Sequence, residues 1–175
     1  MSSIAYDNLP SCLFCGLIFN DSITLKSIFL DLEDAYEQKI DSISEIFHFD
    51  HSSYYKDELG ENLKRVFVSF SRYIDPLEGP KSKLISQTLE KQHTKANKRQ
   101  INIDPGLVSM HNLILYSTKN YAHRIPTIHG VYADLTYIFR TKDINFLPWT
   151  YPDFKNNDIT SYFLNVRNKL KKTIL

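Results

Sequence analysis

Apolar and polar positions follow distinct patterns along the first part of the chain. Leu13–Phe19 is a nearly continuous apolar run, which is typical of a buried central strand. The capping residues Asn20–Ser22 follow it, and apolar side chains then recur at helical spacing, which predicts a helix over Ser22–Glu37. Ile43–Phe49 predicts a second strand, and the polar stretch that follows it, up to Gly60, predicts a loop or a short helical turn.

The middle of the chain shows the same kinds of pattern. Val66–Phe70 alternates with the two-residue period of a strand. Proline and glycine between residues 75 and 80 mark a turn, and an apolar stripe over Leu84–Leu89 predicts a helix. Gln100–Asp104 predicts a short strand that Pro105-Gly106 ends. The order strand, helix, strand, strand, helix, strand predicts a ferredoxin-like βαββαβ sandwich of the α+β class.

The last third of the chain predicts an extension of that sandwich. Leu107–Tyr116 fits either a short helix or a strand. His123–Phe139 predicts a β-hairpin that turns at His129-Gly130. Leu147–Phe154 is stiffened by two prolines and predicts a rigid loop, after which a final helix begins near Asn157. We therefore expect a C-terminal β-hairpin and helix extension.

The composition agrees with one folded domain covering residues 1–175. Hydrophobic residues make up 42% and charged residues 23%, as in globular proteins. No apolar run approaches the roughly 18 residues of a membrane span, so we expect no membrane partner. The N-terminus has no basic start and no long apolar core, and we therefore expect a cytoplasmic protein without a secretory signal.

The charge is unevenly distributed. Residues 1–60 hold three basic and eleven acidic side chains, a net charge of −8, whereas residues 61–175 hold eighteen basic and nine acidic ones, a net charge of +9. A cationic C-terminal region favours an anionic ligand. The alternative is that the two regions neutralise each other in the folded molecule. The same alternatives hold for the basic residues that follow the second helix, which suit either the helix dipole or an anion. They are Lys91, Lys95, Lys98 and Arg99.

Two cysteines are spaced as Cys12-x-x-Cys15, as in half of a zinc site or a redox pair. Because a separation of three on a strand places the two thiols on opposite faces, we expect ordinary core cysteines. His48, Asp50 and His51 lie close together in the sequence, but their spacing matches no recognised metal motif. We therefore expect no metal, and the sequence identifies no cofactor.

Polar side chains that a fold does not require are concentrated in three segments. The first is NIDPG, where Asn102 and Asp104 share one face of a strand before Gly106. Such a pair suits proton transfer or ligand orientation, while Asp before Pro-Gly also suits a purely structural turn. The second is STKNYAHR, where Lys119 and Arg124 offer cationic donors to an anion.

His123, in the same second segment, exchanges a proton near neutral pH, which suggests acid–base work. The alternative for this segment is that Lys119 and Arg124 are paired with internal carboxylates such as Asp134. The third segment is LPWTYPDF, in which Trp149, Tyr151 and Asp153 would form one wall of a pocket.

Several known chemistries lack their motifs. The chain has no GxxxxGK[ST] phosphate loop, no GxGxxG and no GxSxG elbow. Phe67-Val68-Ser69-Phe70 matches the second half of the aromatic RNA-recognition octamer, but Lys64 and Arg65 stand where a glycine and a stacking aromatic belong. RNA binding is therefore kept as an alternative.

The chain resembles a family of uncharacterised bacterial and archaeal proteins, the domain of unknown function 4416 family. The resemblance covers nearly the whole chain and rests on six ordered segments: CGLIFND, YYKDELGENLKR, NIDPG, STKNYAHRI, VYADLTYIF and LPWTYPDF. The family usually has Pro-Phe-Asp where this chain has His48-Phe49-Asp50, and Thr in place of His51. The resemblance implies no reaction, ligand or partner, but it implies that most candidate residues lie within family signature segments.

Two hypotheses follow. In the first, the protein binds an anionic small molecule, such as a phosphorylated metabolite or a nucleotide, with Lys119 and Arg124 against the anion. Asp104 and His123 would then be the acid–base pair of a hydrolase or transferase. Asn102, Gly106, Trp149, Tyr151 and Asp153 would complete the site. In the second, the protein is a non-enzymatic RNA-binding or protein-interaction module whose aromatic strand around Phe67 is exposed. The sequence leaves open whether the protein is an enzyme, and it leaves open its oligomeric state.

Overall fold

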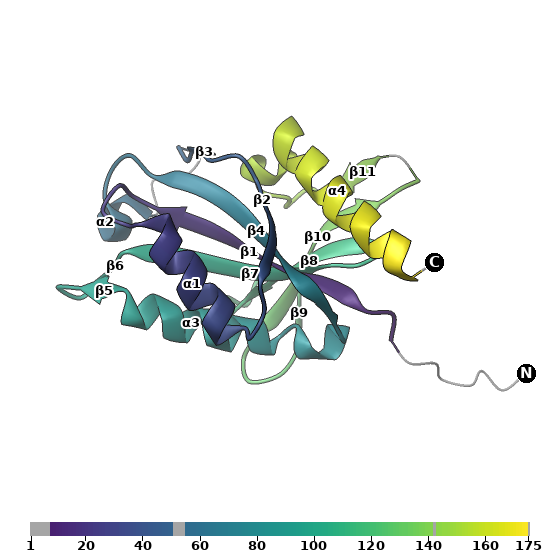
Figure 1. Cartoon of the computed structure of the whole chain (residues 1–175), viewed down its shortest axis with the longest axis horizontal. Coiled ribbons are helices and arrows are strands. Elements are labelled where there is room, and N and C mark those ends of the chain that lie inside the picture. Colours follow the sequence, from purple (N-terminus) through teal and green to yellow (C-terminus); the bar gives the residue numbers. More distant parts are fainter. Residues whose placement is uncertain (1–7, 51–54, 142, 175) are drawn as a thin grey trace, which may run out of the picture.

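The computed structural model describes residues 8–50, 55–141 and 143–174. The fold is α+β, with one large curled antiparallel sheet and helices on both of its faces (Figure 1). The helices of the described residues are α1 (Leu25–Ala35), α2 (Lys56–Leu59), α3 (Lys81–Gln92) and α4 (Asn157–Ile174), and their 3₁₀ turns include η2 (Pro76–Glu78) and η3 (Pro152–Lys155).

The main sheet has the strand order β11-β10-β8-β7-β1-β4-β2, with β3 also paired to β4 and β9 to β10, and a separate small hairpin is formed by β5 and β6. The strands are β1 (Ser11–Phe19), β2 (Ile40–Ile43), β3 (Phe47–His48), β4 (Lys64–Ile74), β5 (Thr94–Lys95), β6 (Lys98–Arg99), β7 (Ile101–Val108), β8 (Asn112–Ser117), β9 (Arg124–Pro126), β10 (Tyr132–Phe139) and β11 (Ile144–Phe146).

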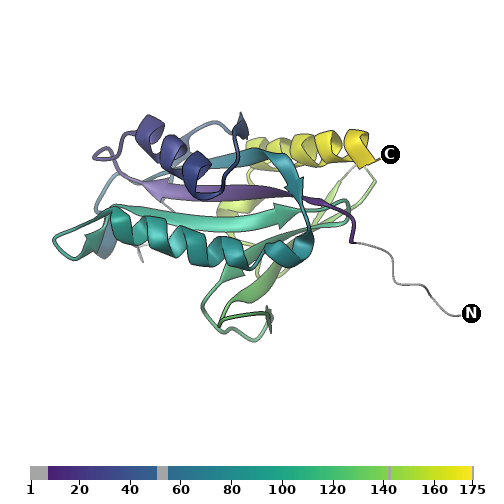
Figure 2. The ribbon, with the colours of Figure 1, turned by 60° about the horizontal axis from the view of Figure 1, so that its bottom comes forward.

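The central strand β1 is buried along its whole length because both of its faces are covered. Its odd-numbered residues, such as Leu13 and Leu17, belong to a core that also contains Leu32 of α1 and Leu89 of α3. Phe14, on the opposite face, packs with α4 residues in a second core. Figure 2 shows α1 and α3 beside the sheet and the end of the β9–β10 hairpin extending beyond α3.

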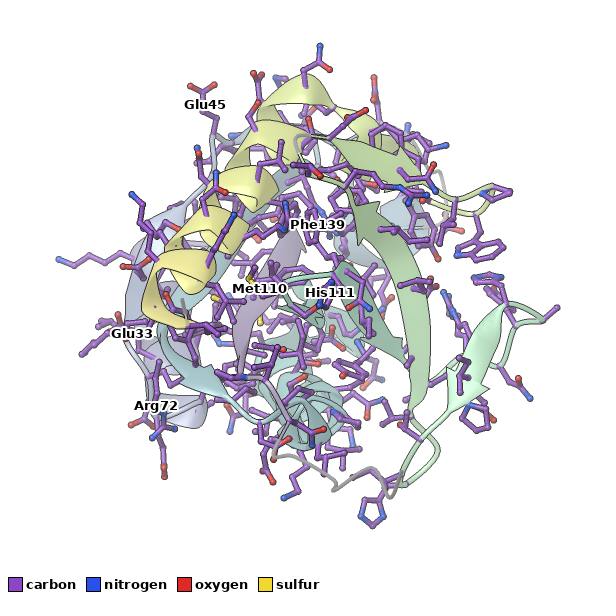
Figure 3. The ribbon with its side chains drawn as sticks, turned by 90° about the vertical axis from the view of Figure 1, so that its right-hand side faces the viewer. Glu33, Glu45, Arg72, Met110, His111 and Phe139 are labelled. Carbon is purple, nitrogen blue, oxygen red and sulfur yellow. The ribbon has the colours of Figure 1, made fainter. Side chains whose placement is uncertain are left out.

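Helix α4 is held to the turn between β7 and β8. Arg167 donates hydrogen bonds to the carbonyls of Met110 (2.8 Å) and Arg140 (3.0 Å). Its guanidinium lies 5.1 Å from the centroid of the Phe139 ring, which is a cation–π contact. Figure 3 shows Met110, His111 and Phe139 beside one another at this end of the molecule.

The cysteine prediction is confirmed. Cys12 and Cys15 are both buried and free, and they belong to the cores on opposite faces of the sheet. Burial raises the pKa of each thiol to about 12, so neither is a reactive thiolate near neutral pH. No helix in the described part of the chain is long and apolar enough to span a membrane.

Several predicted elements differ in extent. The first helix is shorter than Ser22–Glu37, because Asn20 forms a turn in which its Oδ1 accepts a 2.9 Å hydrogen bond from the Ser22 amide. The predicted strand Ile43–Phe49 is instead two short strands, β2 and β3, which pair with successive parts of β4. Leu107–Tyr116 is strand rather than helix, and the predicted hairpin over His123–Phe139 is present.

The prediction that Pro105-Gly106 ends a strand is wrong. Both residues lie inside β7, which continues to Val108. Pro105 lies just outside the β7–β8 ladder, which begins at Gly106, so its missing N–H costs that ladder nothing. Gly106 is required for packing, because a Cβ there would lie 2.4 Å from the Ile114 carbonyl oxygen and 2.5 Å from the Phe14 ring.

The acidic and basic regions of the chain are partly paired. Among the described residues, four contacts join a carboxylate before Gly60 to a Lys, Arg or His side chain after it, and the contact with His93 is an ion pair only when that histidine is protonated. They are Asp21 with Lys64, Asp31 with His93, Glu58 with Arg99, and Asp41 with Lys169. Arg99, one of the basic residues that follow α3, donates hydrogen bonds from β6 to Glu58 and Glu90. Its charge is therefore paired with carboxylates.

Candidate functional site

A buried arginine joins two of the three candidate segments. Arg65 lies on β4, and its NH1 group donates a 2.9 Å hydrogen bond to Oδ2 of Asp104 on β7. Its Nε lies 3.2 Å from Oδ2 of Asp153, which η3 supplies. We call Arg65, Asp104 and Asp153 the Arg65 cluster. One guanidinium therefore holds together the NIDPG segment and the LPWTYPDF segment.

The arginine reaches Asp104 by crossing the strand between them. Gly16 of β1 is paired with Phe67 on one side and with Asp104 on the other. A Cβ on Gly16 would lie 2.8 Å from the Arg65 NH2 atom, so only glycine leaves room for the guanidinium. The guanidinium also lies 4.7 Å from the centroid of the Phe67 ring.

The charges in the Arg65 cluster do not cancel. It combines one guanidinium with two carboxylates, and the Arg65 and Asp153 side chains are almost fully buried. Burial alone would raise the pKa of Asp104, but the charges of Arg65 and Lys83 lower it below its usual value. Asp104 is therefore ionised at neutral pH, and its side chain is still 27% exposed. A carboxylate in this state accepts hydrogen bonds.

Asn102 lies beside Asp104 on the same face of β7. Its Oδ1 accepts a 3.3 Å hydrogen bond from Arg99. Its amide helps to lower the pKa of Asp104, although it forms no hydrogen bond of standard geometry with that carboxylate. Its Nδ2 is buried and makes no hydrogen bond with any described residue. Since buried polar atoms are normally paired, an unpaired donor next to Asp104 is unusual.

Helix α3, on the other face of the sheet, holds the strand that carries these two residues. Between Ile101 and Pro105, β7 has no β8 partner, and two side chains of α3 take its place. Lys83 donates a 3.0 Å hydrogen bond to the Ile103 carbonyl, and Glu90 accepts a 2.6 Å bond from the Ile103 amide. The backbone amide and carbonyl of Ile103 are thus paired without a neighbouring strand.

Arg124 is the centre of a second cluster, which joins the second and third candidate segments. Its Nε donates a 2.8 Å hydrogen bond to Oδ2 of Asp134, and its NH2 donates a 3.0 Å bond to the Tyr151 hydroxyl. Its NH1 donates to Ser117 Oγ and to the Lys119 carbonyl. We call Arg124, Asp134, His123 and Tyr151 the Arg124 cluster. The alternative that Arg124 is paired with Asp134 is therefore confirmed.

His123 is oriented by the same cluster. Its Nε2 lies 3.2 Å from Oδ2 of Asp134, and its ring stacks on Trp149 with centroids 4.9 Å apart. Trp149 is held in turn by a 2.8 Å hydrogen bond from its indole Nε1 to the Leu135 carbonyl. His123 is thus fixed in one orientation by a buried carboxylate and an aromatic ring.

The LPWTYPDF segment is docked on β10, as a rigid loop should be. Thr150 Oγ1 donates a 2.7 Å hydrogen bond to the Thr136 carbonyl, and it accepts one from the Leu147 amide. The Tyr137 hydroxyl donates to the Phe154 carbonyl. These contacts place Tyr151 and Asp153, two residues apart, so that one meets the Arg124 cluster and the other meets the Arg65 cluster.

All three candidate segments therefore contribute to two linked clusters. Tyr151 accepts a hydrogen bond from Arg124 and also lies near Asp104. Burial is the main cause that raises the pKa of Tyr151, and the negative charge of Asp104 adds to the rise. No contact within the described residues joins Asp104 to His123, so the predicted acid–base pair is divided between the clusters. Gly106 lies buried in mid-strand and has no surface to offer a ligand, whereas Lys119 lies exposed beside Arg124.

The condition for the RNA-binding alternative is not met. Phe67 is 0% exposed and packs edge-on against Phe154 and Phe163 of the α4 face. Phe70 is also buried, on the other face of the sheet. The half-octamer is thus an ordinary core strand and offers no bases a stacking surface.

No group of three potential metal ligands occurs among the residues that the structure describes. His48 lies exposed on β3, while His51, which lies close to it in the sequence, falls outside the described residues.

Sequence reasoning missed Arg65 and Gly16. A signal for Arg65 was present, because an arginine stood in an otherwise buried strand at a position that alternates with Val66. Gly16 carried no such signal, since its role depends on the register of β1 between two strands distant in the sequence.

Comparison with known proteins gives one match. No curated protein matches the chain, and no solved structure matches it. A family model described as "Domain of unknown function (DUF4416)" matches residues 10–170, which is nearly the whole chain. All six segments lie within this match, and five of them carry the Arg65 and Arg124 clusters. The chain therefore belongs to the DUF4416 family.

Proposed function

We propose that the protein binds a small polar molecule that carries an anionic group, such as a phosphorylated metabolite or a nucleotide, with its uncharged polar groups next to the Arg65 cluster and its anionic group at Lys119. The observation that carries this proposal is the pair formed by Asn102 and Asp104. A buried amide donor without a partner among the described residues lies beside an ionised, partly exposed carboxylate. Two such groups, held side by side on a rigid strand, recognise a ligand that offers both an acceptor and a donor.

The other candidate residues take supporting roles in this proposal. Tyr151, which is 44% exposed, offers a hydroxyl and an aromatic face next to Asp104. Lys119, on the exposed loop after β8, supplies a positive charge to the anionic group. Arg124 is a positioning residue, because its hydrogen bonds to Asp134 and Tyr151 occupy it internally. Trp149 and Asp153 hold His123 and Arg65 in place.

A thermal-shift screen tests the proposal. The probes are nucleoside mono-, di- and triphosphates and sugar phosphates, because a ligand that binds only the folded state raises the melting temperature. At least one of these probes is expected to stabilise the wild type, and the shift should be lost in Asp104→Asn and in Lys119→Ala. Asp34→Asn, an exposed change on α1, is the matched control and should keep the shift. If no probe stabilises the wild type, or if Asp104→Asn responds as the wild type does, the proposed site is wrong.

A second candidate function is acid–base catalysis, as in a hydrolase or a transferase. The observation that favours it is the contact of 3.2 Å between His123 and Asp134, because a carboxylate that orients an imidazole is the arrangement found in general bases. Any probe that stabilises the protein should then be converted to a product detectable by NMR. His123→Gln should reduce the rate at least about a hundredfold without removing binding. Turnover by the variant at the wild-type rate would refute this role.

We also infer that the core has the predicted ferredoxin-like topology and that the chain is a single domain. The strands that alternate with α1 and α3 as βαββαβ are β1, β2, β4 and β7, and their order in the sheet is β7-β1-β4-β2. Each helix thus connects two strands that have a third strand between them, which is the split βαβ arrangement. β8, β10 and β11 extend the same sheet, which supports one domain rather than two.

A further inference from the structure

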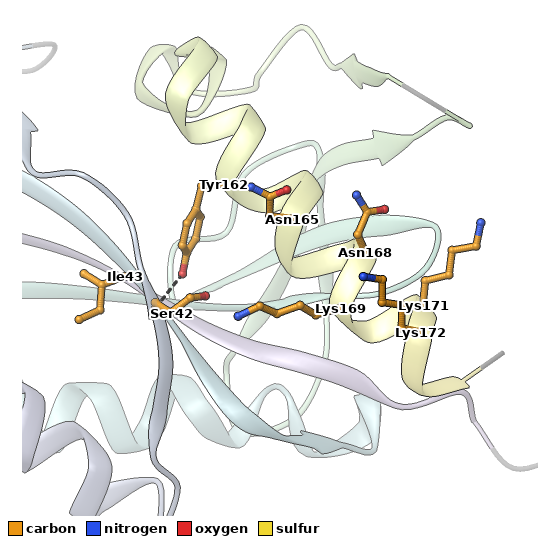
Figure 4. Close-up of a pocket in the computed structure, with 8 residues that line it drawn as sticks. All are labelled: Ser42, Ile43, Tyr162, Asn165, Asn168, Lys169, Lys171 and Lys172. Carbon is orange, nitrogen blue, oxygen red and sulfur yellow. Dashed lines mark hydrogen bonds between the residues drawn. The ribbon is translucent and has the colours of Figure 1, made fainter.

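The other side of the molecule offers an open sheet edge. β2 is the last strand on its side of the main sheet, and no described strand pairs with its outer edge. Figure 4 shows the groove between β2 and α4, with Tyr162 donating a hydrogen bond to the Ser42 carbonyl (3.2 Å). A second groove lies between β2 and α1, and Ile43 lines both of them. The edge strand therefore has a hollow on each of its faces.

The backbone of this edge is oriented to accept another strand. The Ser44 amide donates a 2.8 Å hydrogen bond to the Phe67 carbonyl of β4. Because successive amides of an extended chain point in opposite directions, the Ile43 amide points away from β4 and toward the open edge. A strand laid along β2 would find a donor there.

Large apolar side chains lie along the same edge. Ile43 is 50% exposed and Ile46 is 52% exposed, and Leu30 of α1 is exposed beside the second groove. Soluble proteins normally protect an open edge with charges, prolines or bulges, since exposed aliphatic side chains there promote pairing with another chain. A partner that covers β2 would bury them.

The charge of the larger groove indicates the chemistry of the partner. Its cavity, of about 840 Å³, is lined by three lysines of the last turns of α4, which are Lys169, Lys171 and Lys172. Lys169 is paired with Asp41 of β2 at 2.7 Å. Neither Lys171 nor Lys172 forms an ion pair with a described carboxylate, and both are exposed. The groove thus has an excess of positive charge.

We propose that β2 is a docking edge for an extended acidic segment of a partner protein, which adds to the sheet as a further strand and places carboxylates against the lysines of α4. Main-chain hydrogen bonds to the edge give such a complex its affinity, and side chains in the two grooves give it specificity. This surface is separate from the Arg65 and Arg124 clusters and does not depend on the proposed ligand.

Charge distinguishes this partner from a second copy of the chain. Two copies joined through β2 as antiparallel strands are related by a twofold axis perpendicular to the sheet, so each helix keeps its face. The lysine-rich end of α4 would then lie on the same face as its own symmetry mate, and the like charges would repel. An acidic strand meets no such penalty.

Selection from a display library of random peptides on the immobilised full-length protein tests the proposal. Enriched peptides are expected to be acidic, to alternate apolar and acidic residues, and to lose at least about tenfold in affinity on Lys171→Glu/Lys172→Glu. Lys91→Glu/Lys95→Glu, at the exposed end of α3 and in the hairpin after it, is the charge-matched control and should bind as the wild type does.

The variant Ile43→Pro tests strand addition itself. It removes the outward amide but leaves the pairing of β2 with β4, so the fold should be kept, as circular dichroism can verify, and peptide binding should fall at least about tenfold.

Peptides without acidic residues, peptides that bind Ile43→Pro normally, or a selection without binders would each overturn the proposal. So would a wild-type dimer in light scattering that Ile43→Pro converts to a monomer. Binding of inorganic polyphosphate that survives Ile43→Pro while acidic peptides fail would show a simple anion site instead.

Discussion

Arg65 and Arg124 are both buried arginines beside buried carboxylates, yet their surroundings differ. Arg124 donates four hydrogen bonds to described groups, and its only carboxylate partner is Asp134. Arg65 donates one hydrogen bond to a described group, to Asp104, while its Nε lies near Asp153 without making a hydrogen bond. One centre is balanced and closed, and the other has an excess of negative charge and an incomplete set of partners.

This difference in partners and charge balance indicates that Arg124 is structural, whereas Arg65 lies next to groups that can bind a ligand. A closed pair such as Arg124–Asp134 holds a loop in place and needs nothing further. At the Arg65 cluster, an exposed carboxylate and the Asn102 amide are left for another molecule. Both arginines are buried charged residues on strands. Only their hydrogen-bond partners show which of the two centres has groups left for a ligand.

The largest expected effect is on Arg65. Arg65→Met leaves two buried or half-buried carboxylates without their cation, and we expect a loss of about 3–5 kcal/mol in the free energy of unfolding, measured by urea denaturation. Arg72→Met, an exposed change on the same strand, should stay within about 0.5 kcal/mol of the wild type. A small effect at Arg65 would mean that the cluster does not hold β4, β7 and η3 together.

Arg124→Met is expected to cost less, about 2–3 kcal/mol, because only one carboxylate, Asp134, loses its partner. The Tyr151 hydroxyl and Ser117 are half exposed and can turn to water. Urea denaturation again provides the measurement. A cost larger than that of Arg65→Met would reverse the comparison of the two centres.

Gly16→Ala tests the crossing of Arg65 over β1. The new Cβ would lie 2.8 Å from both the Arg65 NH2 atom and the Phe67 ring, so we expect a cost of about 1–3 kcal/mol. In the Arg65→Met background the cost should be smaller, since a flexible side chain replaces the guanidinium, and a double-mutant cycle measures this coupling. Strict additivity would show that the guanidinium does not need the glycine.

Asp104 gives the smallest effect, and it depends on pH. The pKa of Asp104 is lowered in the folded state, so its ionised form stabilises the fold above the unfolded pKa of about 3.9, and that contribution disappears as the pH falls through the folded value. The advantage of the wild type over Asp104→Asn in unfolding free energy should therefore be full near neutral pH and shrink in acid. An advantage that stays constant down to about pH 2 would contradict this account.

Much of the fold follows from the sequence. The apolar run of β1, the alternation of β4 and the stripe of the last helix are local signals, and each produced the expected element. Pro105 and Gly106 misled because a proline-glycine pair usually marks a turn. Here the neighbouring strand β8 begins just beyond the proline, and a tight contact with Phe14 requires the glycine. Neither fact is visible locally.

The sequence indicated which residues were candidates, but not which residues they would bond in the fold. The sequence indicated which polar side chains were unusual, and the structure brings their three segments together. The sequence suggested the pairing of Arg124 with Asp134, but it did not indicate that Arg65 would connect Asp104 to Asp153, or that His123 would share Asp134 with Arg124. Such pairings depend on strand register, which is set by packing over the whole sheet.

The most direct test of the open Arg65 cluster is the affinity of Asn102→Leu for the best probe of the screen, measured by isothermal titration calorimetry. Because the Asn102 Nδ2 has no described partner and its Oδ1 accepts one long bond of 3.3 Å from Arg99, this variant should unfold within about 1 kcal/mol of the wild type and yet bind at least about tenfold more weakly. Unchanged affinity in a stably folded variant would contradict the proposed site.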